Sequence, residues 1–283
     1  MKIEAFAKIN LTLEVLGKRA DGYHALRSLV VPVSLCDSIV LTGASEIVSD
    51  IPYSDDLCVK AAKALAAAAS VPAGCGVSIK VNKRIPVGGG LGGGSADAAA
   101  VLVALNDMWV LGLSREQLVN IGAGVGSDVP ALVLSRGAGP VLMEGRGEKV
   151  TPFDGVMPQM HFVLANPGVF CSTKQVFKNC ISRVTDDSLI LYNMRKSFAS
   201  GDLEGIAASF MNDLEPAAEA LHPEIGQVKK TLSDLGVLGA TMSGSGSTVF
   251  GIVPSEYEGR KIVDSLRSCG ISAWCVETCC PVV

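Results

Sequence analysis

The sequence predicts an α+β fold. Residues 3–15 alternate apolar and polar side chains as a β-strand does, and an Asp21-Gly22 turn with a second apolar segment after it predicts a hairpin. Alanine-rich segments of helix-forming composition occur at residues 57–69 and 96–106, but strands and helices mix without a regular βαβ rhythm. The 283 residues are enough for one large or two modest domains.

Composition favours small-molecule partners. The net charge is only -4 and no long basic run occurs, which argues against a nucleic-acid or membrane-surface protein. The first residues contain no apolar signal segment, and no later stretch has 18 uninterrupted apolar residues, so we expect a cytoplasmic protein. Nine scattered cysteines without a CxxC pair argue against a disulfide framework or a zinc site, and we expect no protein-bound metal centre. The adjacent Cys279 and Cys280 are expected to form a reduced tail.

The remaining elements follow from local pattern. Residues 74–85, 139–145 and 161–169 predict strands, two helical tracts are expected within 187–235, and residues 239–253 read as one glycine-interrupted strand. Ser114 and Gln117 predict a capping box, while Ser95 and Asp97 are expected to cap or favour the first turn of the helix through residues 96–106. The Gly, Pro and charged residues of 145–160 predict a domain boundary that divides residues 1–155 from 156–283.

Residues 88–94 contain six glycines and join a predicted strand to a predicted helix. Glycines let the backbone approach a ligand closely, and a helix start presents free amides to an anion, so this segment favours polyphosphate binding. Gly88, Gly90 and Gly93 match G-x-G-x-x-G, but no Rossmann unit surrounds them and no G-K-[ST] closes a Walker loop. A flexible linker or a close helix-to-sheet contact is the alternative.

Two glycine motifs resemble those of a known group. Residues 86–96 are similar to the ATP-binding loop of the GHMP kinases, which act on galactose, homoserine, mevalonate and phosphomevalonate, and residues 242–250 resemble their carboxyl-terminal glycine motif. Within that group, AKINLTL (7–13), RADGYH (19–24), GSDVP (126–130) and NPG (166–168) resemble the 4-diphosphocytidyl-2-C-methyl-D-erythritol kinases. The resemblance spans nearly the whole chain. It implies a two-domain GHMP kinase fold, with a ribosomal-protein-S5-like ATP-binding domain, a ferredoxin-like carboxyl-terminal domain and an active site in the cleft between them.

The resemblance also implies an activity. The family transfers the γ-phosphate of ATP, with Mg²⁺, to the 2-hydroxyl of the small molecule 4-diphosphocytidyl-2-C-methyl-D-erythritol, in the non-mevalonate route to isoprenoid precursors. A monomer or weak homodimer is expected. Another GHMP small-molecule kinase of homoserine or mevalonate type is one alternative, although it should lack RADGYH. A catalytically silent ATP-binding module is the other, although it should lack the pair of Lys8 and Asp128.

Two charged residues are the candidate catalytic pair. By resemblance, Asp128 faces the accepting hydroxyl as general base, whereas from sequence alone an Asp before a short helical run is an N-cap. Lys8 and Asn10 share one face of the first strand, about 7 Å apart along it, and a solvated strand face is their simpler explanation. The resemblance assigns Lys8 to orienting Asp128 and favouring its ionised form, and Asn10 to positioning substrate.

The other candidate residues fall into two groups. By resemblance, His24 would form a hydrogen bond with the edge of the substrate's pyrimidine, and Tyr23 and Phe177 would stack on the two faces of that ring. Simple packing is the alternative explanation of each aromatic side chain. The candidate substrate-binding residues are Asn10, Tyr23, His24, Thr173, Phe177, Ser243 and Gly244. For nucleotide, the set is Leu57, Lys83, Pro86, Gly88, Gly89, Gly90, Leu91, Gly92, Gly93, Gly94 and Ser95. The family's usual Asp-Asn-Leu reads Asp55-Asp56-Leu57 here, so adenine contacts at this point are in doubt.

Overall fold

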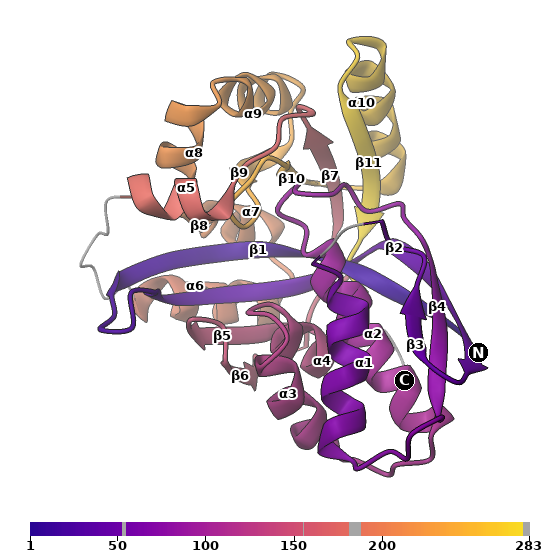
Figure 1. The fold of residues 1–283 in the computed structure, drawn as a ribbon. Coiled ribbons are helices and arrows are strands. Elements are labelled where there is room, and N and C mark those ends of the chain that lie inside the picture. Colours follow the sequence, from indigo (N-terminus) through magenta and orange to yellow (C-terminus); the bar gives the residue numbers. More distant parts are fainter. Residues whose placement is uncertain (53–54, 155, 181–187, 280–283) are drawn as a thin grey trace.

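A long β-hairpin crosses the middle of the molecule. The computed structural model describes residues 1–52, 55–154, 156–180 and 188–279, and the hairpin consists of β1 (Lys2–Lys18) and β2 (His24–Ala44). The two strands pair antiparallel and end with Lys18 opposite His24. Helices pack on both sides of this ribbon (Figure 1). The strand predicted from the alternation at residues 3–15 is therefore confirmed, and so is the hairpin predicted from the Asp21-Gly22 turn.

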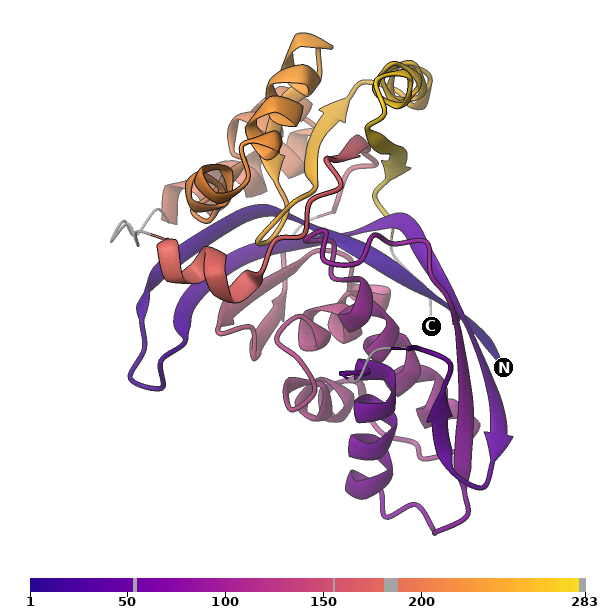
Figure 2. The ribbon, with the colours of Figure 1, turned by 45° about the horizontal axis from the view of Figure 1, so that its top comes forward.

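The hairpin belongs to a sheet of seven strands. The path β3-β4-β2-β1-β8 is extended by β5, which pairs with β2, and by β6, which pairs with β5. These strands are β3 (Ile47–Ser49), β4 (Gly76–Asn82), β5 (Val141–Gly145), β6 (Lys149–Pro152) and β8 (Met211–Asn212). Four helices lie against it on one side of the hairpin (Figures 1 and 2), namely α1 (Leu57–Ala68), α2 (Gly93–Met108), α3 (Arg115–Ala123) and α4 (Val129–Ala138). The middle of α2 is buried on every face.

A second, four-stranded antiparallel sheet lies on the other side of the hairpin (Figure 2), in the order β11-β7-β10-β9. Its strands are β7 (His161–Asn166), β9 (Leu238–Met242), β10 (Val249–Val253) and β11 (Ser272–Glu277). The accompanying helices are α5 (Thr173–Asn179), α6 (Ser188–Ser200), α7 (Leu203–Ala208), α8 (Glu215–Leu221), α9 (Glu224–Asp234) and α10 (Glu256–Ser268). The mixture of helices with two largely antiparallel sheets confirms the α+β class.

Local predictions fared unevenly. The capping box of Ser114 and Gln117 at the start of α3 is confirmed. The prediction that Ser95 and Asp97 cap α2 is wrong, because the N-cap is Gly92 and no side chain caps it. The two helical tracts expected within 187–235 are α6, α7, α8 and α9, interrupted by β8. The single strand expected at 239–253 is two strands, β9 and β10, because the intervening glycines form a loop.

The proposed division into residues 1–155 and 156–283 stays a prediction, since position 155 lies outside the described residues. One strand crosses that division: β8 pairs in parallel with β1 of the first sheet. Within the described part of the chain, no helix has the length and apolar character that spanning a membrane requires. Seven of the described cysteines are free thiols, at positions 36, 58, 75, 171, 180, 269 and 275, while Cys280 lies outside the described residues.

Candidate active site

The glycine run forms a loop that leads into α2. Gly88, Gly90 and Gly92 have φ of +70°, +76° and +68°, which other residues rarely adopt. Gly92 is the N-cap, and the first helical hydrogen bond runs from the Ala96 amide to the Gly92 carbonyl at 2.8 Å. The amides of residues 93–95 therefore precede that first bond and point out of the helix start. Free donors at the positive end of a helix make an anion site.

A second loop packs directly on the first. We call residues 242–248, between β9 and β10, the second glycine loop. The Thr248 amide donates to the Gly89 carbonyl at 3.1 Å, and the Ser243 hydroxyl donates to the Gly90 carbonyl at 3.0 Å. A Cβ on Gly90 would lie 2.1 Å from the Ser243 carbonyl oxygen. Glycine is thus required at position 90 for the two loops to touch.

Lys8 and Asp128 come together beside both loops. Lys8 Nζ lies 3.5 Å from Asp128 Oδ2 and donates to Asn10 Oδ1 at 2.6 Å. The backbone amide of Lys8 donates to the Leu91 carbonyl at 3.0 Å, which ties β1 to the first glycine loop. A Cβ on Gly92 would lie 3.0 Å from Lys8 Cε and 3.6 Å from Asp128 Oδ2. The pair therefore sits next to the residue that opens α2.

The polar residues of β1 are buried, not solvated. Lys8 is 3% and Asn10 1% exposed, and irregular pairing on either side of them in β1 accompanies this burial. Asn10 donates from Nδ2 to the Ser28 hydroxyl at 2.7 Å. Burying an ammonium group is costly unless it is paired, so Lys8 depends on its amide and carboxylate partners. The solvated-face explanation of these residues is therefore wrong.

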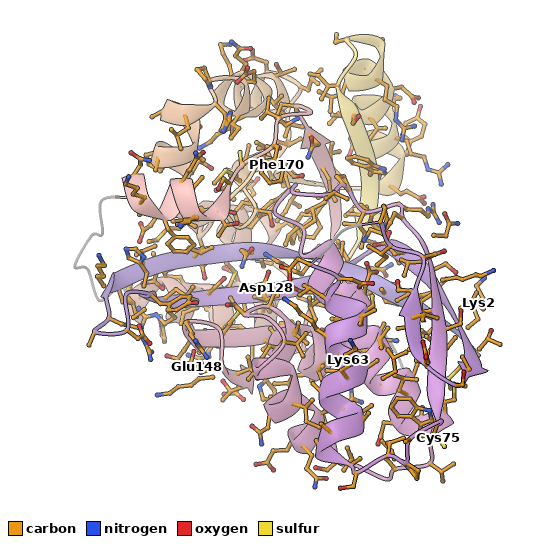
Figure 3. The ribbon with its side chains drawn as sticks, viewed as in Figure 1. Lys2, Lys63, Cys75, Asp128, Glu148 and Phe170 are labelled. Atoms are coloured by element: carbon orange, nitrogen blue, oxygen red, sulfur yellow. The ribbon has the colours of Figure 1, made fainter. Side chains whose placement is uncertain are left out.

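Asp128 is at the start of α4, as the sequence suggested, but it does not act as a cap through its side chain. Its carboxylate makes no capping hydrogen bond to the helix and is 31% exposed. Figure 3 shows Asp128 close beneath the β1–β2 ribbon, between that ribbon and the helices of the first half. The carboxylate is thus held by Lys8 on one side and is open to solvent on the other. A carboxylate in this setting can accept a proton from a bound hydroxyl.

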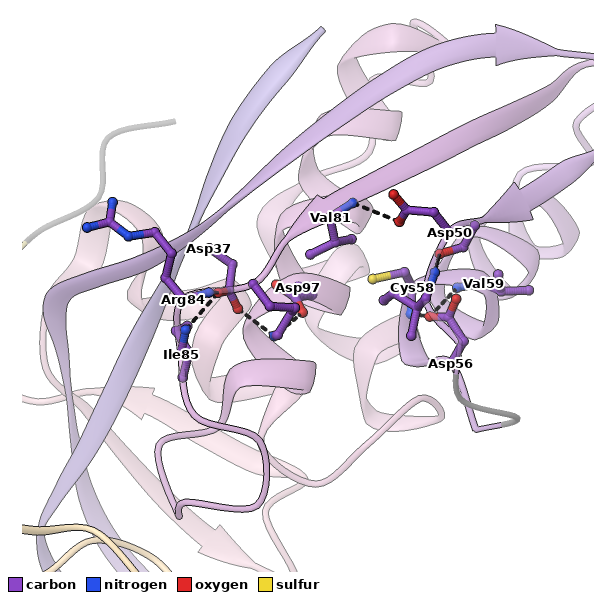
Figure 4. A network of polar contacts seen from close by, with 12 residues as sticks. Asp37, Asp50, Asp56, Cys58, Val59, Val81, Arg84, Ile85 and Asp97 are labelled. Carbon is purple, nitrogen blue, oxygen red and sulfur yellow. Dashed lines mark hydrogen bonds and ion pairs between the residues drawn. The ribbon is translucent and has the colours of Figure 1, made fainter. Parts of the chain in front are cut away.

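Lys83 lies beside the start of α2, because a Cβ on Gly93 would be 3.4 Å from its Nζ, and its role at the nucleotide stays a prediction. Its Nζ contacts Asp37 Oδ2 at 2.5 Å and Asp97 Oδ2 at 2.6 Å, and Figure 4 shows these two aspartates close to each other. Asp37 is also the acceptor for the amides of Arg84 and Ile85. Burial raises the pKa of Asp97 to about 7 despite the opposing effect of the Lys83 charge, and the neighbouring Asp37 raises it further. The carboxylates raise the pKa of Lys83 although its burial acts the other way.

The remaining nucleotide candidates converge at the start of α1 and α2. A Cβ on Gly94 would meet only Leu57 Cδ1, at 3.6 Å, and a Cβ on Gly126 would lie 3.8 Å from Ser95 Oγ. Leu57 is the first residue of α1, and Asp56 caps that helix by accepting from the amides of Cys58 and Val59. A capping role explains an acidic residue at position 56 without any contact to a ligand.

Pro86 is half-buried just before the loop. Gly93 differs from Gly94 because a Cβ there would press on Ile85 at 3.0 Å. A side chain at position 93 would therefore have to displace Ile85, whereas Gly94 is exposed and has space.

The predicted cytidine residues gather at the end of the hairpin. The rings of His24 and Phe177 stack on each other, with centroids 5.2 Å apart. Tyr23 is 54% exposed, and the Arg146 guanidinium lies 5.4 Å from its ring centroid. A hollow of about 220 Å³ opens beside Tyr23 and Arg146, with Ser127 of the Asp128 loop on its wall. Phe177 thus faces His24, and Tyr23 lies next to a hollow lined by the residues on either side of Asp128 and Val129, namely Ser127 and Pro130.

Other contacts complete the site. Thr173 and Ser245 share a hydrogen bond of 2.8 Å, which joins α5 to the second glycine loop. A Cβ on Gly244 would lie 3.2 Å from Lys8 Nζ. Sequence reasoning missed Arg146, Ser28 and Asn212. Only Arg146 had a signal, a positive charge in a glycine-flanked turn. Nothing local marks Ser28, which accepts from Asn10, or Asn212, which donates to the carbonyls of Met242 and Gly244.

Comparisons with known proteins agree with this geometry. Residues 56–136 match the model of the GHMP kinases N terminal domain, and residues 194–272 match that of the GHMP kinases C terminal. A 4-diphosphocytidyl-2-C-methyl-D-erythritol kinase from Symbiobacterium thermophilum is 40% identical, over 98% of this chain and 99% of its own. One from Bacillus cytotoxicus is 39% identical, over 94% and 92%. The chain belongs to the 4-diphosphocytidyl-2-C-methyl-D-erythritol kinase family, within the GHMP kinases.

Solved structures extend this family assignment to the whole fold. The crystal structure of a 4-(cytidine 5'-diphospho)-2C-methyl-D-erythritol kinase matches with a TM-score of 0.84 at 34% identity, covering 98% of both chains. A homoserine kinase from Cytophaga hutchinsonii and the mevalonate kinase from Methanococcus jannaschii each match with a TM-score of 0.71 at 18% and 15% identity. Those two share the fold alone. Membership of this kinase family implies that the chain uses ATP and acts on a small molecule.

Proposed function

We propose that this chain transfers the γ-phosphoryl group of ATP to the 2-hydroxyl of 4-diphosphocytidyl-2-C-methyl-D-erythritol, giving the 2-phosphate and ADP. The observation that carries the proposal is the pair of Lys8 and Asp128, whose Nζ and Oδ2 lie 3.5 Å apart beside the free amides at the start of α2. A site for the phosphates of the donor and a group that can accept a proton thereby lie next to each other. The names of the full-length relatives support the choice of acceptor.

The start of α2 would hold the polyphosphate. The amides of residues 93–95 and the positive end of the helix favour an anion, and Gly94 leaves room because its missing Cβ has only Leu57 as a neighbour. Mg²⁺ prefers oxygen ligands and is commonly held jointly by protein and phosphate oxygens. The Ser95 hydroxyl fits that role, with the metal neutralising charge on the phosphates. Among the described residues no cluster of three metal-binding side chains occurs, which suits a metal carried by ATP.

Asp128 would act on the acceptor. The 2-hydroxyl is borne by a methyl-substituted carbon and is essentially un-ionised at neutral pH, so its proton must pass to a base as the phosphoryl group arrives. Lys8, whose Nζ lies 3.5 Å from Asp128 Oδ2, would hold the carboxylate at this point, and Asn10, fixed by Ser28, positions Lys8 through the 2.6 Å hydrogen bond between them. Phosphoryl transfer depends mostly on positioning and charge stabilisation, which this rigid buried set supplies.

The end of the hairpin would select the cytidine. Its base would enter between Phe177 and Tyr23, with His24 bonding its edge, and this requires the observed stack of His24 on Phe177 to open. Arg146 would fix Tyr23 through its cation–π contact. Stacking is worth roughly 1–3 kcal/mol per base. Thr173 and the second glycine loop with Ser243 and Gly244 would line the path of the diphosphate between base and sugar.

The test is an acceptor panel with a catalytic variant. Wild-type enzyme with ATP and Mg²⁺ should phosphorylate 4-diphosphocytidyl-2-C-methyl-D-erythritol and reject homoserine, mevalonate, galactose and free 2-C-methylerythritol 4-phosphate. Asp128→Asn should lower kcat by roughly two to four orders of magnitude while ATP affinity, measured by calorimetry, stays within about twofold. Preference for one of the other alcohols would refute the substrate assignment, and near-normal turnover by Asp128→Asn would remove Asp128 from the role of base.

A further inference from the structure

We propose that Asn212 is a positioning residue of the kinase reaction, which holds the second glycine loop in register with Lys8. The proposal rests on the function proposed above. Asn212 lies on the two-residue strand β8, which pairs in parallel with β1 between the site and the second half of the chain. It touches neither Lys8 nor Asp128 by any contact the structure records. It acts through the backbone of the second glycine loop.

The side-chain amide of Asn212 is fully used. It is 8% exposed, and Nδ2 donates to the Met242 carbonyl at 2.6 Å and to the Gly244 carbonyl at 2.8 Å. Its Oδ1 accepts from the Leu214 amide at 2.9 Å. Among Asn, Asp and Leu, only Asn supplies two donors and one acceptor in this geometry, because an ionised Asp offers acceptors only and Leu offers neither. The amide therefore fixes both ends of the turn that begins the second glycine loop.

The residues that follow Asn212 anchor this clamp to the framework. The Asp213 amide donates to the Leu13 carbonyl at 2.9 Å, and Asp213 Oδ2 accepts from the Val15 amide at 2.8 Å. Glu215, 8% exposed, accepts from the Met242 amide at 2.7 Å and from the Thr241 hydroxyl at 2.9 Å. Residues 212–215 thus tie β1, the strand that bears Lys8, to the start of the second glycine loop.

The far side of that loop is the active site itself. Gly244 has φ +57°, and a Cβ there would lie 3.2 Å from Lys8 Nζ and 3.5 Å from Asn10 Oδ1. The Gly244 backbone is therefore a wall against which the Lys8 ammonium rests. A shift of the Gly244 backbone would therefore change the position that Lys8 Nζ can take relative to the Asp128 carboxylate. A displacement of about 1 Å in a reacting geometry can cost about 100-fold in rate.

The effect should fall on turnover more than on nucleotide binding. The amides at the start of α2 are held by the helix and not by Asn212, whereas Lys8 is in direct reach of Gly244. We expect Asn212→Asp, which turns a donor toward two carbonyls into an acceptor, to lower kcat by roughly 10- to 100-fold. The dissociation constant for ATP, measured calorimetrically without acceptor, should change by less than about threefold.

Asn106 provides a matched control. At the end of α2 it braces a loop in the same way, since its Nδ2 donates to the Leu113 carbonyl at 3.1 Å and its Oδ1 accepts from the Leu113 amide at 2.9 Å. Asn106→Asp should lower the melting temperature as Asn212→Asp does, but keep kcat within about twofold. Equal kcat losses in the two variants, or an unchanged kcat in Asn212→Asp, would overturn the proposal.

Hydrogen exchange on the milder Asn212→Ser variant tests the clamp without relying on turnover. The amides of Ser243, Gly246 and Thr248 are hydrogen-bonded, and they should exchange at least tenfold faster than in the wild type, while α3 is unchanged. Unchanged exchange there would also refute the proposal. If the wild-type enzyme fails on 4-diphosphocytidyl-2-C-methyl-D-erythritol, the proposed function falls, whereas faster exchange in the variant would still support the clamp.

Discussion

Replacing Asp97 with asparagine should remove a pH dependence from the stability of this protein. Asp97 is 1% exposed on α2, its Oδ2 pairs with Lys83, and its Oδ1 has no hydrogen-bond partner. Burial raises the pKa of Asp97 from 3.8 to about 7, and the adjacent Asp37 adds to the effect. Two carboxylates share one ammonium here, and the folded state therefore favours a proton on Asp97.

The sign follows from proton linkage. Because the folded-state pKa is the higher one, the folded protein binds more protons than the unfolded chain between pH 4 and 7, so stability falls as pH rises through that window. The full shift corresponds to about 4 kcal/mol at 1.4 kcal/mol per pKa unit. Between pH 5 and pH 8 the unfolding free energy of the wild type should fall by roughly 2 to 3 kcal/mol relative to Asp97→Asn, with little further change above pH 8.

Urea unfolding at pH 5, 6, 7 and 8 measures this difference directly. Asp107→Asn is the control, because Asp107 lies on the same helix but is exposed, and its difference from the wild type should be flat across the range. A constant offset between Asp97→Asn and the wild type would refute the argument, since it would mean that Asp97 titrates alike in folded and unfolded chains. If the wild type instead gained stability relative to Asp97→Asn as the pH rises, the effect of the Lys83 charge on the pKa of Asp97 would outweigh the effect of burial.

Three further variants separate binding from folding. Gly94→Ala should weaken ATP binding at least tenfold in calorimetry without lowering the melting temperature, since the added methyl meets only an ordinary contact; unchanged affinity would move the phosphates away from this turn. Gly90→Ala should lower the unfolding free energy by roughly 2–4 kcal/mol in urea, from its positive φ and its overlap with the Ser243 carbonyl, and a loss under about 0.5 kcal/mol would show that the loops yield. Changing Tyr23 and Phe177 together to alanine should raise KM for the cytidine substrate at least tenfold with ATP affinity intact; parallel loss of both would indicate misfolding.

Local patterns were enough wherever the deciding contacts are local. The Ser114 and Gln117 capping box is formed by groups three residues apart, and the alternation of residues 3–15 dictates which side of a strand is apolar, so both were predictable. The glycine run likewise predicted a loop with positive φ angles before a helix, and the structure has one. Alternation failed to reveal that Lys8 and Asn10 are buried, because a second layer of structure covers their face of β1.

The sequence by itself determined the hairpin, the glycine loop and helix α2, and with the family motifs the pairing of Lys8 with Asp128. Only the tertiary structure decided which other charges meet. Lys83 contacts Asp37 and Asp97, residues 46 and 14 positions away. Asn212 reaches Gly244 across 32 positions. Such contacts depend on how sheets and helices pack, and buried polar groups must find partners wherever packing brings them, which no local pattern encodes.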